Sequence, residues 1–419
     1  MREQDTGPRA PTGVIPALSL LAVLGPMTTD LYLPAFPRMA ADLGASAAQI
    51  QWSLSATLLG VAAGQLVFGP LSDAVGRRWP LMSATGIHVV ASTAIALVGS
   101  AEWLVVWRLL QGLGAAGVSV LATAIARDAF EGRRLVQVLA RLALLSGLAP
   151  VIAPLLGSLL LSAAGWRGVF VALAGYGLIA VVLCFATLPE TMTSAGSRLK
   201  ARQSVRRRYV AVLGDRGLVG GAIVGAMMVG GVFAYLSASS FAFQTTYGLS
   251  ADGYALVFAV NASAFALGSQ VAARALTRSS PRPVLRWALS AALVAGAGMG
   301  LMSLWEVGVV GFTVAAFVFL LAAGACLTTV QVVALQQHAR QAGTAASVLG
   351  FINFGFASIV SPLSSTGPDR VLALGVLLTG LSCVALVSLR LLVTPALKRR
   401  ERTPCSVPAV TCEDSRSSE

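Results

Sequence analysis

Long apolar runs recur along the whole sequence, and they constrain the fold more than any other feature. Each run has roughly 20 residues, the length that an α-helix needs to cross about 30 Å of hydrocarbon. Hydrophobic residues make up 56% of the 419-residue chain and charged residues only 11%, whereas soluble domains carry about 25% charged residues. The sequence therefore predicts an all-α membrane protein.

Twelve transmembrane helices are expected. Helices are favoured over a barrel because the runs are continuous, while barrel strands alternate apolar and polar residues. The first run is longer than a signal-peptide core, so we expect it to be retained. The expected spans are residues 13–36, 50–71, 79–99, 102–125, 136–162, 166–188, 217–243, 252–273, 284–304, 307–331, 343–365 and 370–393.

The basic residues indicate the orientation of these spans. With both termini in the cytoplasm, most of the 30 Lys and Arg residues fall on cytoplasmic segments, in agreement with the positive-inside rule. Only Arg38, Arg167 and Arg370 fall on segments expected outside, and Arg108 lies within a span. The net charge of +13 is thus a topology signal. We expect a multi-pass protein of the inner (cytoplasmic) membrane that does not bind nucleic acid.

A polar, basic segment after the sixth span divides the chain into two halves. An offset of 204 residues places Gly44 on Gly248 and Gly64 on Gly268, which indicates a weak internal duplication. Two six-helix bundles with a substrate site between them are the architecture of many secondary transporters. The expected divisions are a cytoplasmic N-terminus (1–12), a first bundle (13–188), a cytoplasmic linker (189–216), a second bundle (217–393) and a disordered cytoplasmic tail (394–419).

Two ionisable side chains lie well inside the expected spans, namely Asp30 and Arg108. A charge within the bilayer costs at least about 2.5 kcal/mol on insertion scales, so each one needs a reason. Counted from the helix ends, both lie about 10 Å deep. They can therefore pair across helices 1 and 4 or share a water-filled cavity. One interpretation is a structural ion pair; the other is a proton site whose affinity changes with the separation of the two groups.

Three local motifs resemble those of the major facilitator superfamily. They are GQLVFGPLSDAVGRRWPL (residues 64–81), RLLQGLGAAG (108–117) and SGLAPVIAPLLG (146–157), and the last is similar to a pattern of drug/proton antiporters. Ala74 stands where many members carry Arg. An ordinary basic loop and simple close packing remain alternative explanations. The residues that the resemblance assigns to gating are Gly69, Asp73, Gly76, Arg77, Arg78, Gln111, Gly147, Pro150, Pro154 and Gly157.

A closer resemblance, to the bacterial Bcr/CflA drug exporters, comes from TTDLYLPAFPRMAADL (residues 28–43), VFAYLSASSF (232–241) and AGTAASVLGF (342–351). It implies that Asp30 and Arg108 couple transport to protons. It also implies a substrate cavity lined by Asp30, Leu33, Phe233, Phe258, Asn261 and Phe354. Related broad-range exporters carry a second acid where this chain has Ala22. A single acid favours neutral or zwitterionic drugs such as chloramphenicol, florfenicol or bicyclomycin.

The function expected from these features is drug:proton antiport by alternating access. The expected partners are a small-molecule drug, protons and the lipid bilayer, and we expect a monomer. No motif indicates a catalytic residue, a metal site or a cofactor. A proton-coupled transporter of an endogenous metabolite or nutrient is the alternative, and a channel or membrane-embedded enzyme is a more remote one. Other polar residues within spans, such as His88, are interpreted as hydrogen-bond partners between helices.

Overall fold

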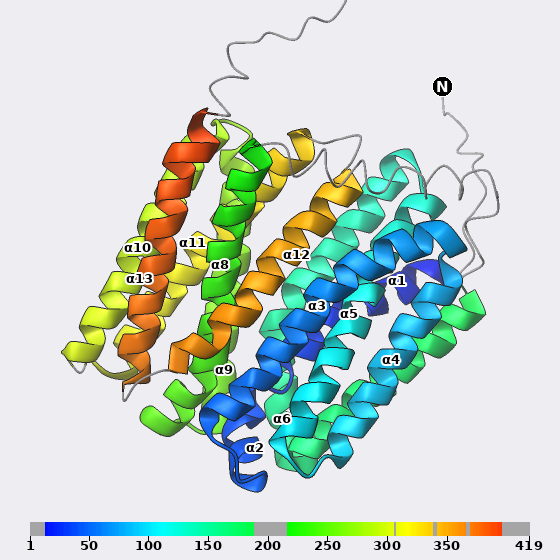
Figure 1. Cartoon of the computed structure of the whole chain (residues 1–419), viewed down its shortest axis with the longest axis horizontal. Coiled ribbons are helices and arrows are strands. Elements are labelled where there is room, and N and C mark those ends of the chain that lie inside the picture. The colour runs from blue at the N-terminus through cyan, green and yellow to red at the C-terminus, as the bar shows by residue number, and fades with distance from the viewer. Residues whose placement is uncertain (1–12, 188–215, 306, 338–341, 366–368, 396–419) are drawn as a thin grey trace, which may run out of the picture.

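The computed structural model describes residues 13–187, 216–305, 307–337, 342–365 and 369–395. Every element in these ranges is helical (Figure 1). The expected N-terminal segment, residues 189–215 of the expected linker and residues 396–419 of the expected tail lie outside the described residues. The elements are α1 Val14–Asp30, η1 Leu33–Ala35, α2 Phe36–Asp42, α3 Ala47–Val75, α4 Arg78–Leu97, α5 Ala101–Ala129, α6 Gly132–Thr187, α8 Arg216–Phe241, η2 Ala242–Thr246, α9 Ala251–Ala275, α10 Pro281–Leu304, α11 Gly308–Gln337, α12 Ala342–Val360, η4 Ser361–Ser365, α13 Arg370–Ser388 and η5 Leu389–Val393.

Within the described ranges, 11 helices are long and apolar enough to cross a membrane, where the sequence predicts twelve spans. The difference lies in α6, which has 56 residues and contains both spans expected at 136–162 and 166–188. Gly165 breaks its regular geometry with φ 69° and ψ −178°, so that two helices meet there at a kink. The expectation of an all-helical membrane fold is confirmed.

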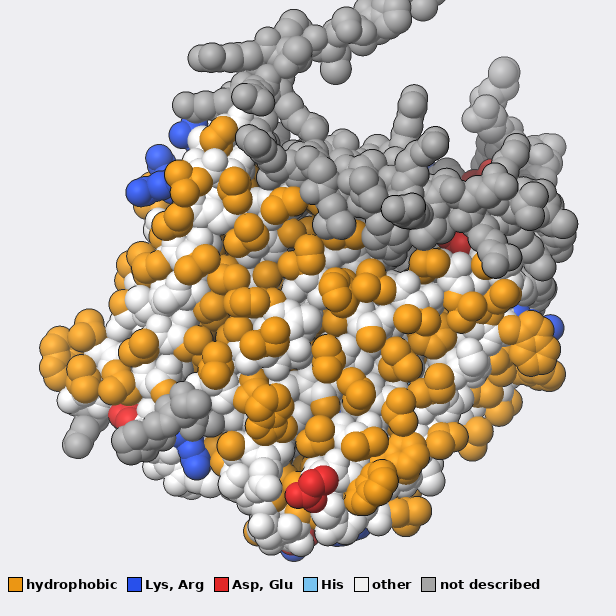
Figure 2. Space-filling model, in the orientation of Figure 1, with side chains coloured by type: hydrophobic (Ala, Val, Ile, Leu, Met, Phe, Trp, Pro, Cys, Tyr) orange, Lys and Arg blue, Asp and Glu red, His pale blue; other side chains and the backbone are white. Residues whose placement is uncertain are grey.

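The outer surface of the helices is apolar over a broad area. Figure 2 shows that the charged side chains visible on this face lie toward its margins, while the middle is hydrophobic or uncharged. Large aliphatic side chains on this surface are widely exposed, for example Leu97 at 80% and Val294 at 71%. Such exposure is unfavourable in water and favourable in hydrocarbon. The surface is therefore suited to contact with lipid.

The helices from α1 to α6 occupy one side of the molecule and those from α8 to α13 the other (Figure 1). The two sides meet where α12 packs on α3 and where α6 packs on α9. Each side contains helices that pack closely through glycine. For example, a Cβ on Gly112 of α5 would meet the carbonyl of Thr57 in α3, and one on Gly324 of α11 would meet the carbonyl of Phe265 in α9. Small residues permit this close approach of two backbones in a membrane.

The helix boundaries differ from the expected spans mainly at the polar ends. The first span was expected to end at residue 36, but the apolar helical segment runs from Val14 to Asp42. Pro34 and Pro37 do not end it because each lies in the first turn of a new helical segment, where a missing N–H is tolerated. Likewise α3 begins at Ala47, before the expected residue 50, because Ser46 and Gln49 form a capping box.

Candidate functional site

Asp30 lies at the end of α1, where the two sides of the molecule meet. Its side chain is 3% exposed and its Oδ1 atom has no hydrogen-bond partner. It is the one buried carboxylate in the part of the chain that the structure describes. Tyr32 from the same segment and Tyr254 from α9, on the opposite side, both lie within range of its charge. The charge of this carboxylate therefore acts on one tyrosine from each half of the molecule.

Arg108 of α5 is fully buried and is held by neutral groups. Its Nη1 atom donates to the carbonyl of Thr28 at 3.0 Å and to Oε1 of Gln111 at 2.5 Å. The guanidinium carbon lies 3.9 Å from the centre of the Tyr32 ring and 5.7 Å from that of Phe170. Aromatic faces attract a desolvated cation. The Nε and Nη2 atoms have no hydrogen-bond partner.

The direct pairing of Asp30 with Arg108, one of the two arrangements expected from their depth, is not formed in this conformation. The ion pairs found among the described residues are Arg38–Asp42, Arg77–Asp73 and Arg77–Asp128. Equal depth was an insufficient guide, because a backbone carbonyl and an amide supply the acceptors that Arg108 uses. Both charged residues retain unpartnered polar atoms, so the site still has capacity for new hydrogen bonds.

Three of the expected substrate residues lie along α8, α12 and η1. The ring centroids of Phe233 and Phe354 are 5.8 Å apart, and both side chains are partly buried. Leu33 is fully buried, and its carbonyl accepts a hydrogen bond of 2.6 Å from Ser240 of α8. Leu33 therefore joins the two sides of the molecule through its backbone as well as through packing.

The other two expected substrate residues, Phe258 and Asn261, lie together on α9 against Tyr235 of α8. The rings of Tyr235 and Phe258 stack with centroids 6.3 Å apart, and Asn261 donates to the Tyr235 hydroxyl at 2.7 Å. Oδ1 of Asn261 is buried without a partner. The sequence analysis missed Tyr235 and Tyr254, although Tyr235 is part of the VFAYLSASSF motif. Phe233 and Phe354 thus contact each other, and Phe258 and Asn261 are joined through Tyr235.

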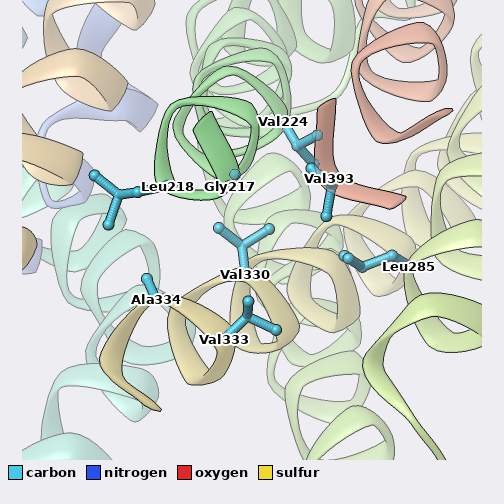
Figure 3. Close-up of a pocket in the computed structure, with 9 residues that line it drawn as sticks. Gly217, Leu218, Val224, Leu285, Val330, Val333, Ala334 and Val393 are labelled. Atoms are coloured by element: carbon cyan, nitrogen blue, oxygen red, sulfur yellow. The ribbon is translucent and has the colours of Figure 1, made fainter. Parts of the chain in front are cut away.

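A small cavity lies elsewhere, within the second half of the chain. It has a volume of about 10 Å³ and is lined by apolar residues of α8, α10, α11 and η5 such as Leu218, Leu285, Val330 and Val393 (Figure 3). Cavities that hold drug-sized ligands measure about 300–1,000 Å³. None of the expected substrate residues lines this cavity, and it has no place in the proposed site.

The loop between α3 and α4 carries a charged network that includes residues assigned to gating. Arg77 donates to Asp73 of α3 at 2.5 Å and to Asp128 of α5 at 2.9 Å. Burial lowers the pKa of the Arg77 guanidinium, but hydrogen bonds and charge from Asp128 and Asp73 outweigh this effect and raise the pKa above its ordinary value. Arg78 donates to the carbonyl of Phe185 in α6. The sequence analysis missed Asp128, which follows Arg127 at the end of α5.

The remaining expected gating residues have different surroundings. A Cβ on Gly157 would meet the carbonyl of Leu31, next to Asp30, whereas one on Gly147 would meet nothing within 4 Å. Gly147 thus makes no close helix contact in this structure. Pro154 is buried and Pro150 partly buried within α6.

Two further gating glycines lie on and after α3. Gly69 faces Ser347 of α12, and Gly76 ends α3 with φ 106°, a conformation that favours glycine.

Comparison with known proteins decides the family. The sequence pattern described as "Major Facilitator Superfamily" matches residues 18–362. The chain belongs to the major facilitator superfamily. It is therefore a multi-pass membrane transporter of small molecules rather than an enzyme. This fits the helical fold and the lipid-facing surface described above.

Several curated members of the superfamily are similar over most of the chain. An "Uncharacterized MFS-type transporter YdgK" of Bacillus subtilis is 34% identical, covering 86% of this chain and 90% of the relative. A "Chloramphenicol resistance protein" of Pseudomonas aeruginosa is 31% identical, covering 88% of each. A "Bicyclomycin resistance protein homolog" of Haemophilus influenzae is 29% identical, covering 83% of this chain and 87% of the relative. These names support the drug:proton antiporter subgroup of the superfamily.

Solved structures of other superfamily transporters share the fold at low identity. A bacterial homologue of the human lysosomal transporter Spinster, in an inward-facing and unoccupied conformation, has a TM-score of 0.70 and 15% identity, covering 94% of this chain and 98% of that one. A D-xylose–proton symporter also has a TM-score of 0.70, with 14% identity over 90% of this chain and 96% of its own. At this identity the likeness concerns the fold alone.

Proposed function

We propose that this transporter exports small neutral or zwitterionic antibiotics in exchange for protons. The observation that carries the proposal is Asp30, a buried carboxylate with an unpartnered oxygen at the junction of the two halves. A buried ionisable group in a membrane protein commonly marks a proton or substrate pathway. Protonation neutralises Asp30, and release of the proton restores a charge that both halves of the molecule face.

Contacts between the halves at both ends of the interface support transport by alternating access. At the end that holds η1, Gln244 of η2 donates to the carbonyl of Pro34 at 3.1 Å, and the rings of Phe36 and Phe241 lie 5.8 Å apart. Toward the other end, Gly350 of α12 lies directly against the Gln65 side chain of α3. Opening one set while the other stays closed exposes Asp30 to one side of the membrane at a time.

The proposed topology has twelve membrane crossings, with both termini in the cytoplasm. The proposed membrane is the inner membrane of the cell. At 1.5 Å per residue, the 56 residues of α6 are more than twice as long as the hydrocarbon is thick. The kink at Gly165 therefore serves as the turn between two crossings. The same topology divides the protein into the bundles 13–188 and 217–393, with the basic segment 189–216 on the cytoplasmic side.

The proposed substrates are neutral or zwitterionic because Asp30 is the one buried acid among the described residues and Arg108 is a buried cation nearby in the same half. The relatives named for chloramphenicol and bicyclomycin resistance support this class. Exchange of one proton for a neutral drug moves a charge, which supplies about 2.3 kcal/mol per 100 mV and about 1.4 kcal/mol per pH unit. Strong export of a permanently charged quaternary amine would contradict this substrate class.

Replacing the carboxylate tests the coupling. The Asp30→Asn variant should reach the membrane and bind drug but lose export against a concentration gradient, because an amide does not exchange protons. The measurement is accumulation of chloramphenicol, florfenicol and bicyclomycin in an efflux-deficient host, with and without a protonophore. Asp252→Asn, at an exposed acid in the first turn of α9, is the matched control and should export normally. Full export by Asp30→Asn would refute the proposal.

A proton-coupled importer of a metabolite is the second candidate. The observation in its favour is that the buried carboxylate of Asp30 can couple protons to transport in either direction. The two functions differ in the direction of transport. In everted membrane vesicles with an acidified interior, an exporter accumulates the drug inside, whereas a proton symporter releases preloaded substrate. We expect accumulation.

A further inference from the structure

A closed ring of hydrogen bonds holds Arg108 in place, and it includes a histidine that the proposed mechanism does not use. Arg108 donates to the carbonyl of Thr28 and to Oε1 of Gln111. Nε2 of Gln111 donates to Oγ of Ser92 at 2.7 Å, and Ser92 donates to the carbonyl of His88 at 2.7 Å. Nε2 of His88 lies 2.9 Å from Oγ1 of Thr28, which closes the ring. The five residues come from α1, α4 and α5.

The hydrogens within this ring can be assigned by counting them. The Thr28 hydroxyl lies 2.6 Å from the carbonyl of Leu24 and donates its single hydrogen there. Nε2 of His88 must then carry a hydrogen and donate to Thr28. Nδ1 of His88 has no partner, and a Cβ on Gly177 of α6 would lie 3.2 Å from it. The ring is thus complete with a neutral imidazole.

The ring determines which groups Arg108 can reach. Thr28 supplies its backbone carbonyl to Arg108 and its hydroxyl to His88, and Asp30 is only two residues further along the same segment. Oδ1 of Asp30 and two nitrogens of Arg108 nevertheless remain unpartnered. Buried opposite charges attract each other strongly when no other contacts hold them apart. The ring of hydrogen bonds and the aromatic face of Tyr32 supply those contacts.

We propose that His88 is a positioning residue that, by holding Thr28, keeps Arg108 away from Asp30 and thereby sets the pH at which Asp30 exchanges its proton. This inference rests on the proposed function of Asp30. The titratable groups around Asp30 are Tyr32 from its own segment and Tyr254 from α9. Arg108 from α5 stacks on Tyr32, and His88 from α4 faces Arg108. Of these groups Arg108 carries the fixed positive charge, so a change in its distance would change the proton affinity of Asp30.

Loss of the His88 hydrogen bond should let Arg108 approach Asp30. A nearby guanidinium stabilises the carboxylate and lowers its affinity for protons, by about one to three pH units for a close pair. Asp30 would then release its proton at lower pH. The His88→Ala and Thr28→Val variants should both show this shift, since each removes one partner of the same bond. His88→Gln should restore the wild-type behaviour, because its amide can donate to Thr28.

The test reads the protonation of Asp30 directly, using dicyclohexylcarbodiimide, which modifies protonated carboxyl groups in apolar surroundings. Full-length protein in liposomes is labelled across a range of pH, and mass spectrometry measures the fraction modified at Asp30. We expect the pH of half-maximal labelling to fall by about one unit in His88→Ala and Thr28→Val and to stay at the wild-type value in His88→Gln. An unchanged pH of half-maximal labelling in both His88→Ala and Thr28→Val would overturn the inference. If His88→Ala does not fold, Thr28→Val alone decides.

A double variant separates this inference from a general structural effect. In an Arg108→Gln background, His88→Ala should not move the labelling profile further, because the shift acts through Arg108. A shift of equal size in that background would also overturn the inference. The proposed function fails separately, if Asp30→Asn exports drug at the wild-type level. The two failures are therefore distinguishable.

Discussion

At the scale of single residues, the contacts of the two charged side chains within the membrane do not follow from their positions in the sequence. Depth along the helices predicted that Asp30 and Arg108 lie at the same level. Depth does not tell which acceptors face a guanidinium, and Arg108 is in fact bound by Thr28 and Gln111 and stacked on an aromatic ring. These partners are neutral; Gln111 is only three residues from Arg108, whereas Thr28 and Tyr32 come from a distant part of the chain. The identity of the charged residues was therefore predictable, while their contacts were not.

Asp369 gives a residue-scale prediction outside the membrane spans. It caps α13 by accepting from the backbone N–H groups of Val371 and Leu372, and Ser303 at the end of α10 donates to it. Burial is the largest single influence and raises the pKa of this carboxyl, but the three hydrogen bonds together outweigh it and lower the pKa below its ordinary value. A lowered pKa in the folded protein means that the carboxylate stabilises it above about pH 4 and that this contribution disappears as the pH falls further.

The comparison of two variants measures this contribution. Asp369→Ala removes the cap and should cost about 1 kcal/mol at neutral pH, seen as a lower unfolding temperature of the purified protein. Asp369→Asn keeps a cap that does not titrate. The difference in unfolding temperature between wild type and Asp369→Asn should shrink below about pH 4. A difference that stays constant over the same pH range would contradict the assignment.

At the scale of helices, the sequence predicted which segments are helical better than where they begin, bend and touch. Apolar length located the spans because the bilayer sets the length of a helix. The continuation of the first helical segment to Asp42 was missed, since the prolines within it were interpreted as an end although they lie in first turns. The loop motif contains both Asp73 and Arg77, which form an ion pair. Asp128 was missed because it comes from another helix.

The two glycines of the α6 motif give a prediction at this scale. Gly157→Ala should force α1 and α6 apart next to Asp30, because its Cβ would collide with the carbonyl of Leu31. Overpacking of this kind costs about 1–3 kcal/mol, and we expect lower thermal stability together with weaker drug export. Gly147→Ala should be neutral, since Gly147 faces open space. Purified variants compared by thermal unfolding and export assay test this difference, and equal behaviour of the two variants would contradict the proposed contact.

At the scale of the whole molecule, the structure is closed at both ends of the interface between its halves. Ser240 holds the carbonyl of Leu33 at one end, and Gly69 of α3 faces Ser347 of α12 toward the other. The sequence indicated two halves through its weak internal duplication, but contacts across the interface join residues with no relation in sequence. In this closed conformation the expected substrate residues contact protein side chains, as Phe233 contacts Phe354 and Asn261 contacts Tyr235.

The central claim is that binding of drug and binding of a proton at Asp30 exclude each other. The most direct measurement adds chloramphenicol, and separately florfenicol and bicyclomycin, to purified protein in weakly buffered solution and records the pH. The account predicts that at least one of these drugs releases protons from the wild-type protein and none from Asp30→Asn, while both proteins bind that drug. Drug binding to the wild-type protein without release of protons, or equal release from Asp30→Asn, would contradict the account.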